Sequence, residues 1–315
     1  MPDWKAAPVS VKWSSKSNQP TYKNMKRLKT KWSLLLAAIP AAAITAHVIA
    51  QNVEPKPAPA HVCTEDVEWG ALNPARGDKG PRAGTLWGDR TGAGTSGFLV
   101  KFADGFSSPP HIHNVTYRGV VISGLVHNDD PEAEKMWMSA GSFWTQPAGQ
   151  VHITAAKGSN AMAYIEIDSG PYLVHPKEKA FSGAEQPVNV DASNIVWLSA
   201  ASSTWIDAGF ATGPEIAFLW GNPQDTKPGG TMVKLPSGFV GSIRNNGSAL
   251  RAVVVKGKAK LLLTGDEKSS SLEPGHYFGS DEKTQHQLVN EGTEECILYI
   301  RTEGKFDIVP AEPKP

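Results

Sequence analysis

Cysteine, net charge and helical periodicity are all scarce in this sequence of 315 residues. The two cysteines, Cys63 and Cys296, are too few for a disulfide framework and do not have the spacing of a metal-binding motif. They either pair with each other or, as we slightly favour, stay as two free thiols. Basic and acidic residues balance at 31 each, and no basic stripe runs through the body of the chain. This argues against nucleic acid as a partner, because phosphate binding needs clustered cations.

Turn-forming residues and short β-forming runs are what the sequence has in abundance. It contains 30 glycines and 24 prolines, and runs of β-branched and aromatic residues lie between them. The predicted strands of the first half are GFLVKFA, YRGVVISGLV, GSFWTQP, HITAA and AMAYIEID, and those of the second half are TMVKLP, LRAVVVKGKAKLLL, GHYFGS and CILYIRT. The pattern predicts an all-β fold, either a sandwich or a barrel.

The first fifty residues differ in composition from the rest and predict export. A basic cluster at 26–31 precedes the apolar run SLLLAAIPAAAITAHVIA, which ends at Ala50 before Gln51. This is the layout of a secretory leader, so we expect cleavage near Ala50-Gln51 and a periplasmic or secreted protein. An uncleaved membrane anchor is the alternative, although the apolar run is short. Because Met25 directly precedes the basic cluster, translation starts at either Met1 or Met25.

The rest of the chain repeats itself. LWGDRTG at 86–92 returns 133 residues later as LWGNPQD at 219–225, and one inserted residue later His152 corresponds to His286. A nearly constant offset of this kind indicates an internal duplication. We therefore divide the chain into an N-terminal extension and leader at 1–50, a Pro-rich spacer at 51–62, a first domain at 63–180 and a second domain at 195–310.

Three histidines of the first copy are candidate metal ligands. His111 and His113 end the pattern Gly105-x5-His-x-His, and they project together because alternate residues of a strand share a face. His152 ends the pattern Gly141-x5-Pro-x-Gly-x2-His, whose turn can fold the next strand back beside them. Neutral imidazoles in a fixed cluster suit Zn, Fe, Ni or Cu. The alternative is that histidines at this spacing hold no metal.

These two patterns are the signature motifs of the cupin superfamily, which the sequence resembles over both copies. The stretch PPHIHNVTYRGVVISG at 109–124 is similar to the ChrR-like cupins, which include exported bicupins. The resemblance implies an all-β protein with two tandem jelly-roll-like β-barrels that arose by duplication. It also implies a divalent cation in the first barrel, with Fe(II) or zinc expected first and manganese or nickel as alternatives.

The fourth ligand of the usual cupin pattern is missing. Cupins usually place a glutamate three or four residues after the second histidine, where this chain has Tyr117 and Arg118. Arginine stays protonated and cannot bind a metal, and a tyrosine ligand would need its pKa of about 10 lowered. We therefore expect a three-histidine site with open positions, which are typical of catalytic metal sites. Tyr117, Arg118 and Gln150 are weak candidates for contacts to the substrate or to the ligands.

Other polar residues carry weaker signals. Glu166 and Asp168, on the last strand of the first copy, are either exposed or supply a distant carboxylate to the metal. The histidines outside the two motifs are expected to face solvent or to bond locally, and these are His127, His175 and His276.

The second copy lacks the metal motif. The constant offset places Arg244 and Asn246 at the positions of the paired histidines, and only His286 remains. One histidine does not hold a divalent ion, so we expect a degenerate, metal-free cupin domain. Its role is to complete the fold, to cover a β-edge or to form a homodimer surface, or else to bind an anion through Arg244.

An arginine is shared by the two copies. Arg251 stands at the position of Arg118, although its copy has lost the paired histidines. This favours a structural role for Arg118, such as pairing with an acidic residue, over a role in metal chemistry.

Two functions fit these patterns. The first is an exported metalloenzyme of the dioxygenase type that acts on a small dicarbonyl or enolisable compound, as the resemblance to three-histidine cupin dioxygenases implies. The second is a non-catalytic binding or sensor protein for a metal or small ligand, because the ChrR-like cupins include zinc-binding regulatory domains. In both cases the expected partner is a small molecule, with membrane contact only through an uncleaved leader.

Overall fold

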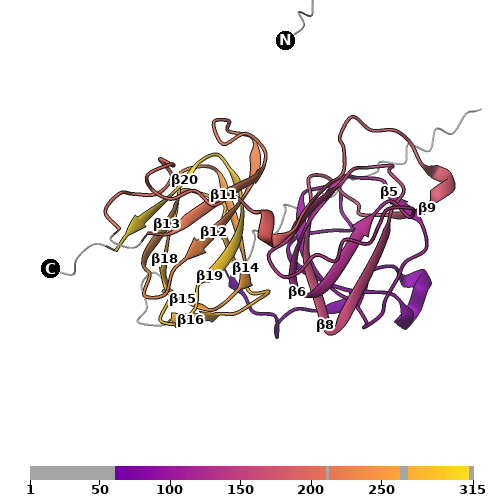
Figure 1. Ribbon diagram of the computed structural model, residues 1–315, viewed down its shortest axis with the longest axis horizontal. Coiled ribbons are helices and arrows are strands. Elements are labelled where there is room, and N and C mark those ends of the chain that lie inside the picture. The colour runs from indigo at the N-terminus through magenta and orange to yellow at the C-terminus, as the bar shows by residue number, and fades with distance from the viewer. Residues whose placement is uncertain (1–60, 211–212, 263–268, 312–315) are drawn as a thin grey trace, which may run out of the picture. The chain divides into compact units, whose positions relative to one another are not determined.

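The computed structural model describes residues 61–210, 213–262 and 269–311, which all belong to one compact unit (Figure 1). The predicted leader at 1–50 and nearly all of the Pro-rich spacer lie outside these residues. In the part of the chain that the structure describes, no helix is long and apolar enough to cross a membrane.

The fold is all-β, as predicted, and every strand pair is antiparallel apart from one isolated bridge. Three short 3-10 helices interrupt the strands: η1 at Pro74–Lys79, η2 at Lys177–Lys179 and η3 at Ala192–Asn194. The predicted strands all appear, with two adjustments. HITAA and AMAYIEID join in one long strand, and LRAVVVKGKAKLLL is split into two at Gly257.

The first copy is built on a seven-stranded sheet in the order β10-β7-β6-β8-β4-β3-β2. Its strands are β2 (Trp69–Ala71), β3 (Arg82–Gly88), β4 (Ser96–Lys101), β6 (Tyr117–Asp129), β7 (Phe143–Gln146), β8 (Ile153–Ile167) and β10 (Val188–Val190). A second, two-stranded sheet pairs β5 (His111–His113) with β9 (Val174–Pro176), and Figure 1 shows these two strands side by side.

The second copy has a six-stranded sheet in the order β1-β17-β14-β19-β12-β11 and a five-stranded sheet in the order β16-β15-β18-β13-β20. The strands of the first are β1 (His61–Val62), β11 (Glu215–Trp220), β12 (Pro228–Leu235), β14 (Ala249–Lys256), β17 (Tyr277–Ser280) and β19 (Cys296–Glu303). Those of the second are β13 (Val240–Asn245), β15 (Ala259–Leu262), β16 (Ser269–Leu272), β18 (Gln285–Val289) and β20 (Phe306–Pro310).

The internal repeat is visible in the strand order. The run β7-β6-β8-β4-β3 of the first copy matches β17-β14-β19-β12-β11 of the second. The outer neighbours differ, because β10 from the joining stretch covers β7, whereas the N-terminal strand β1 covers β17. The short strands β10 and β1 thereby become the outer strands on this side of the two sheets, and short edge strands are less prone to edge-to-edge association.

The two large sheets share a hydrophobic core in addition to the interior core of each copy. Side chains of the first copy such as Trp87 and Tyr164 pack in one cluster with Val253 and Tyr299 of the second. This explains why the run YRGVVI of β6 is buried on both of its faces. A continuous apolar run is typical of a strand that is covered on two sides.

Candidate metal centre

The structure brings the three motif histidines together. His111 and His113 lie at the two ends of β5, and His152 directly precedes β8. Two reciprocal backbone hydrogen bonds of 3.0 Å join His111 to His152. One ring nitrogen from each histidine lies within 4.8 Å of the other two, and the ring centroids are 4.3 to 5.3 Å apart.

The glycines of the second motif produce the turn that delivers His152. Gly141 and Gly149 have φ angles of 91° and 77°, a region that favours glycine. The amide of Gly149 donates to the carbonyl of His113 at 2.8 Å, which closes the turn against β5. A Cβ at Gly149 would also overlap Phe181. The glycines at these fixed positions of the motif therefore allow the backbone turn that brings His152 beside β5.

Hydrogen bonds fix the tautomer of each imidazole. In all three rings Nδ1 lies within hydrogen-bond distance of a backbone carbonyl, and a carbonyl oxygen can only accept. Nδ1 therefore carries the proton, and Nε2 keeps its lone pair for a metal, an arrangement common to histidine ligands. The acceptors of His111, His113 and His152 are the carbonyls of Pro109, Leu173 and Gln150, at 2.9, 3.1 and 3.2 Å.

Burial keeps the three rings neutral. It lowers the pKa of His152 to about 3, and the neighbouring His111 adds to the effect. Burial likewise lowers the pKa of His113 well below its ordinary value and, to a smaller extent, that of His111. Because a metal binds the deprotonated imidazole, no proton has to be displaced from these rings near neutral pH.

Two tyrosines complete the cluster. Tyr117, at the usual glutamate position, places its hydroxyl 3.3 Å from His152 Nε2 and donates to Asn128 Oδ1 at 2.8 Å. The hydroxyl of Tyr172 lies 3.2 Å from His113 Nε2, and its ring stacks on that histidine at 4.3 Å. Burial raises the pKa of both phenols, which disfavours a phenolate ligand. No sequence motif marks Tyr172.

A cavity of about 500 Å³ opens on the cluster. His111, His113 and Tyr117 are among the residues that line it. Much of the remaining wall is apolar and includes Val100, Phe102, Phe106, Trp144 and Ile165. Such a mixture of apolar walls and a few convergent polar groups is typical of small-molecule sites.

Arg118 and Gln150 do not line this cavity. Neighbouring residues of a strand point to opposite faces, so Arg118 turns away when Tyr117 faces the cluster. Its guanidinium pairs with Asp168 at 2.7 Å and lies 3.7 Å above the ring of Trp220. The side chain of Gln150 donates to the carbonyl of Glu185 at 3.5 Å. Of the three candidates, Tyr117 lines the cavity, and Gln150 contacts a candidate metal ligand through its carbonyl, which accepts from His152 Nδ1 at 3.2 Å. A contact of any of the three with substrate stays a prediction.

Glu166 and Asp168 lie in the contact between the two copies and not at the histidines. Glu166 is fully buried and accepts hydrogen bonds from the hydroxyls of Tyr164 and Tyr299, at 3.1 and 2.7 Å. Arg301 of the second copy pairs with both carboxylates, at 3.4 Å to Glu166 and 2.7 Å to Asp168. The alternative of a distant carboxylate ligand is therefore wrong, as is the expectation that Glu166 is exposed.

The other histidines have different surroundings. His127 is buried and donates to the carbonyl of Met136 at 3.3 Å, so it bonds locally as expected. His175 lines the cavity wall. His276 is buried, and its Nδ1 lies 3.1 Å from the carbonyl of Ser271, so it bonds locally, which is the second of the two expected arrangements.

The register of the second copy corrects the alignment by one residue. His286 pairs with Ile243 across β13 and β18, as His152 pairs with His111 in the first copy. The residues equivalent to His111 and His113 are therefore Ile243 and Asn245, which are both buried. Arg244 lies between them and is exposed. A one-residue slip moves a strand's side chains to the other face, which is why the constant offset chose the wrong residues.

Comparison with known proteins places the chain in a family. The family model described as "Domain of unknown function (DUF4437)" matches residues 61–309. The chain belongs to the DUF4437 family. No curated protein matches the sequence. The family match covers both copies and includes all three motif histidines and the N-terminal strand β1.

Solved structures show the fold of this DUF4437 chain. An oxalate decarboxylase from Lactobacillus farciminis, in a formate complex, aligns with a TM-score of 0.52 and 11% identity over 81% of this chain and 89% of its own. A "putative dioxygenase" from Nostoc punctiforme aligns with a TM-score of 0.53 and 13% identity over 75% and 79%. These likenesses confirm the cupin-type jelly roll, and the three-histidine cluster supports binding of a divalent metal.

Proposed function

We propose that this chain is a metal-dependent cupin of the dioxygenase type, in which His111, His113 and His152 hold one divalent cation. Its substrate is a small dicarbonyl or enolisable compound. The observation that carries the proposal is the arrangement of the three imidazoles. Each donates through Nδ1 to a backbone carbonyl and keeps the lone pair of Nε2, and one ring nitrogen of each histidine lies within 4.8 Å of the other two.

The surroundings of the cluster suit a small chelating substrate. The cavity has a largely apolar wall, and the polar histidine cluster is a place where a substrate's oxygens can bind. When bound, the cation supplies Lewis-acid polarisation or oxygen activation, and Fe(II) is the ion that suits the second of these. Tyr172, which burial keeps protonated, can donate a hydrogen bond to a substrate oxygen once the cation occupies Nε2 of His113, whereas the hydroxyl of Tyr117 donates to Asn128 and can only accept from a substrate.

Of the two solved structures named above, one is described as a "putative dioxygenase" and the other as an oxalate decarboxylase, so the panel of test compounds includes oxalate. The test is to load the purified full chain with Fe(II) under anaerobic conditions and to follow oxygen uptake with a panel of diketones, keto acids, phenolic compounds and oxalate. We expect uptake with a subset of the diketones and keto acids, and its loss in His152→Ala. Full metal loading without oxygen uptake across the panel would count against the dioxygenase.

A second candidate is a non-catalytic protein that binds a metal or a small ligand. The position of the tyrosines favours it, because the two hydroxyls lie within 3.3 Å of two of the three Nε2 atoms and take up space beside the ion. A binding protein is expected to hold zinc, to consume no oxygen and to show a saturable heat of binding with a ligand of the same panel.

We also propose that the protein is exported and is a ChrR-like member of its superfamily. The basic cluster and the apolar run before Gln51 support export, and the stretch PPHIHNVTYRGVVISG supports the finer family assignment. N-terminal sequencing of the processed chain tests the export. A mature chain that begins at Gln51 is expected, and a chain that keeps residues 26–50 would contradict cleavage.

A further inference from the structure

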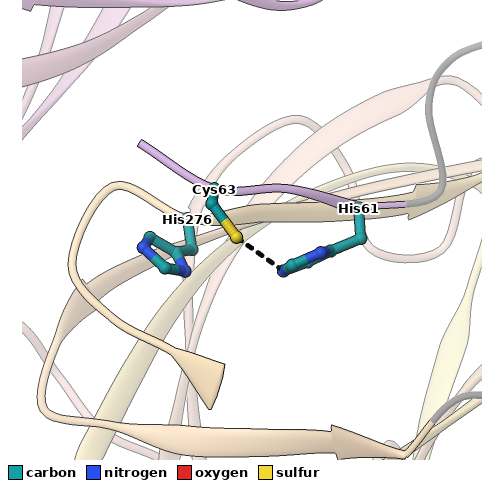
Figure 2. Close-up of side chains that lie close together, drawn as sticks. All are labelled: His61, Cys63 and His276. Atoms are coloured by element: carbon teal, nitrogen blue, oxygen red, sulfur yellow. Dashed lines mark hydrogen bonds between the residues drawn. The ribbon is translucent and has the colours of Figure 1, made fainter. Parts of the chain in front are cut away.

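A second group of metal-binding side chains lies at the edge of the other large sheet. His61, Cys63 and His276 each offer a ligand atom within 4.8 Å of the other two. Figure 2 shows His61 and Cys63 on the N-terminal segment, with the sulfur of Cys63 directed at the ring of His61 and His276 beside it. These residues share no member with the histidine cluster of the first copy.

Strand pairing explains why residues so far apart in the sequence meet. β1 pairs antiparallel with β17, with His61 opposite Phe278 and Val62 opposite Tyr277. The same register, continued by one residue, places Cys63 opposite His276. His61 and Cys63 are two residues apart and so share a face of the strand. The three side chains are therefore held on one face by backbone pairing.

The backbone and the ring of His276 are both fixed. Its amide donates to the carbonyl of Glu273 at 2.8 Å, and its own carbonyl accepts from the amide of Val254 at 2.9 Å. Nδ1 lies 3.1 Å from the carbonyl of Ser271, so Nδ1 carries the proton and Nε2 keeps its lone pair. The carboxylate of Glu65 lies 3.4 Å from that Nε2. The carboxylate adds a negative charge beside this nitrogen, which favours a bound cation there.

The separation of Cys63 from His61 is close to that around a tetrahedral ion, and the third ligand atom lies within 4.8 Å of both. Cys63 Sγ lies 3.9 Å from His61 Nε2. Around a tetrahedral zinc ion, with bonds of about 2.3 Å to sulfur and about 2.0 Å to nitrogen, a sulfur and a nitrogen ligand lie about 3.5 Å apart. The difference is a few tenths of an ångström. Side-chain rotation at the end of a short strand can supply it.

We propose that His61, Cys63 and His276 bind one zinc ion, and that the exposed side chain of Glu65, whose carboxylate lies 3.4 Å from His276 Nε2, turns in as the fourth ligand. A thiolate and two imidazoles select zinc over hard cations such as magnesium and calcium. The ion fastens the N-terminal strand, which has only two paired residues, to the sheet of the second copy. It is a structural site, because four protein ligands leave no open position. The inference does not depend on the proposed catalytic function.

Cobalt(II) is the probe that separates the two sites, because only this one contains sulfur. We expect the reduced full chain to bind two equivalents of Co(II) and to develop the near-ultraviolet absorption of a cobalt thiolate. Cys63→Ser should lose that absorption and one equivalent. Cys296→Ser, which alters the other, buried cysteine, should keep both. His152→Ala should lose one equivalent and keep the absorption, so the two proposals fail separately.

The wild-type measurement decides the matter even if a variant does not fold. Absence of the cobalt-thiolate absorption from the fully loaded wild-type chain would overturn the proposal, and would leave His276 and Glu65 as a simple ion pair. Persistence of the absorption in Cys63→Ser would also overturn it. Direct zinc analysis of the chain as purified should show the second equivalent without added metal.

Discussion

The two copies share a strand order but differ at the one place where chemistry can occur. In the first copy the inward positions opposite His152 hold histidines and adjoin a cavity. In the second copy Ile243 stands opposite His286, and its side chain is part of the hydrophobic core with Phe278 and Phe306. The fold therefore does not need the metal. Two inward side chains, Ile243 and Asn245 in place of His111 and His113, separate the structural domain from the candidate metal centre, because His286 keeps the position of His152.

The copies have also diverged into complementary partners. Glu166 and Arg301 occupy equivalent positions, since Glu166 pairs with Gly97 and Arg301 with Gly230 in corresponding strands. Each is flanked by an equivalent tyrosine that accepts a hydrogen bond from a tryptophan, Trp87 in one copy and Trp220 in the other. The same position is thus an acid, Glu166, in the first copy and a base, Arg301, in the second, and these two side chains contact each other.

The largest expected effect comes from removing the equivalent histidine in each copy. His152→Ala should lower the metal affinity of the first copy more than about 100-fold. Loss of a residue that only hydrogen-bonds to a metal ligand already lowers metal affinity about 10- to 100-fold, and loss of a ligand itself costs more. His286→Ala should leave that affinity unchanged. Isothermal titration with Zn(II) checks both, and equal losses in the two variants would show that the copies do not differ as described.

The contact between the copies provides the next largest effect. Glu166→Ala removes a carboxylate that is fully buried and leaves the guanidinium of Arg301 with the half-exposed Asp168 alone. Breaking a buried pair in this way costs about 3–5 kcal/mol of folding free energy. The control is Glu185→Ala, whose 3.5 Å pair with Arg118 is partly exposed and is worth about 1 kcal/mol or less.

Chemical denaturation of the two variants measures these losses. A loss for Glu166→Ala no greater than that for Glu185→Ala would show that the acid and base at the duplicated position do not hold the copies together.

For His286, the histidine of the second copy that corresponds to His152, we expect a smaller, pH-dependent effect. Burial lowers the pKa of His286 to about 4, from an ordinary value of 6.5. The unfolded chain therefore takes up a proton first as the pH falls, and the stability lost is about 1.4 kcal/mol per pH unit between those values. The stability is fully present above pH 6.5. Denaturation from pH 7.5 to 4.5 should show a flatter profile for His286→Gln, and parallel profiles would contradict a neutral buried ring.

The sequence predicted local features well and tertiary pairings poorly. Its two histidine motifs and its strands are local patterns, and the shared Arg118 and Arg251 positions correctly indicated pairing with acids, here Asp168 and Asp281. The faces of β13 were misassigned because a constant offset does not detect a one-residue slip.

Two further features depend on contacts between distant segments. Tyr172 reaches the histidines through the stretch that leads into β9, which pairs with β5, and Cys63 reaches His276 only because β1 crosses to the second copy's sheet. Neither segment carries a local pattern that identifies its partner strand. The sequence alone therefore gives no reason to connect Cys63 with His61 and His276, which lie beside it in the structure.

The most direct test of the three-histidine centre is anomalous X-ray diffraction at the metal edge from crystals of the cobalt- or zinc-loaded chain. The expected result is a peak about 2.0–2.1 Å from Nε2 of His111, His113 and His152, with no peak at Asn245 and His286 of the second copy. A loaded crystal without a peak between the three Nε2 atoms, or with one bound through Nδ1, would contradict the proposed centre.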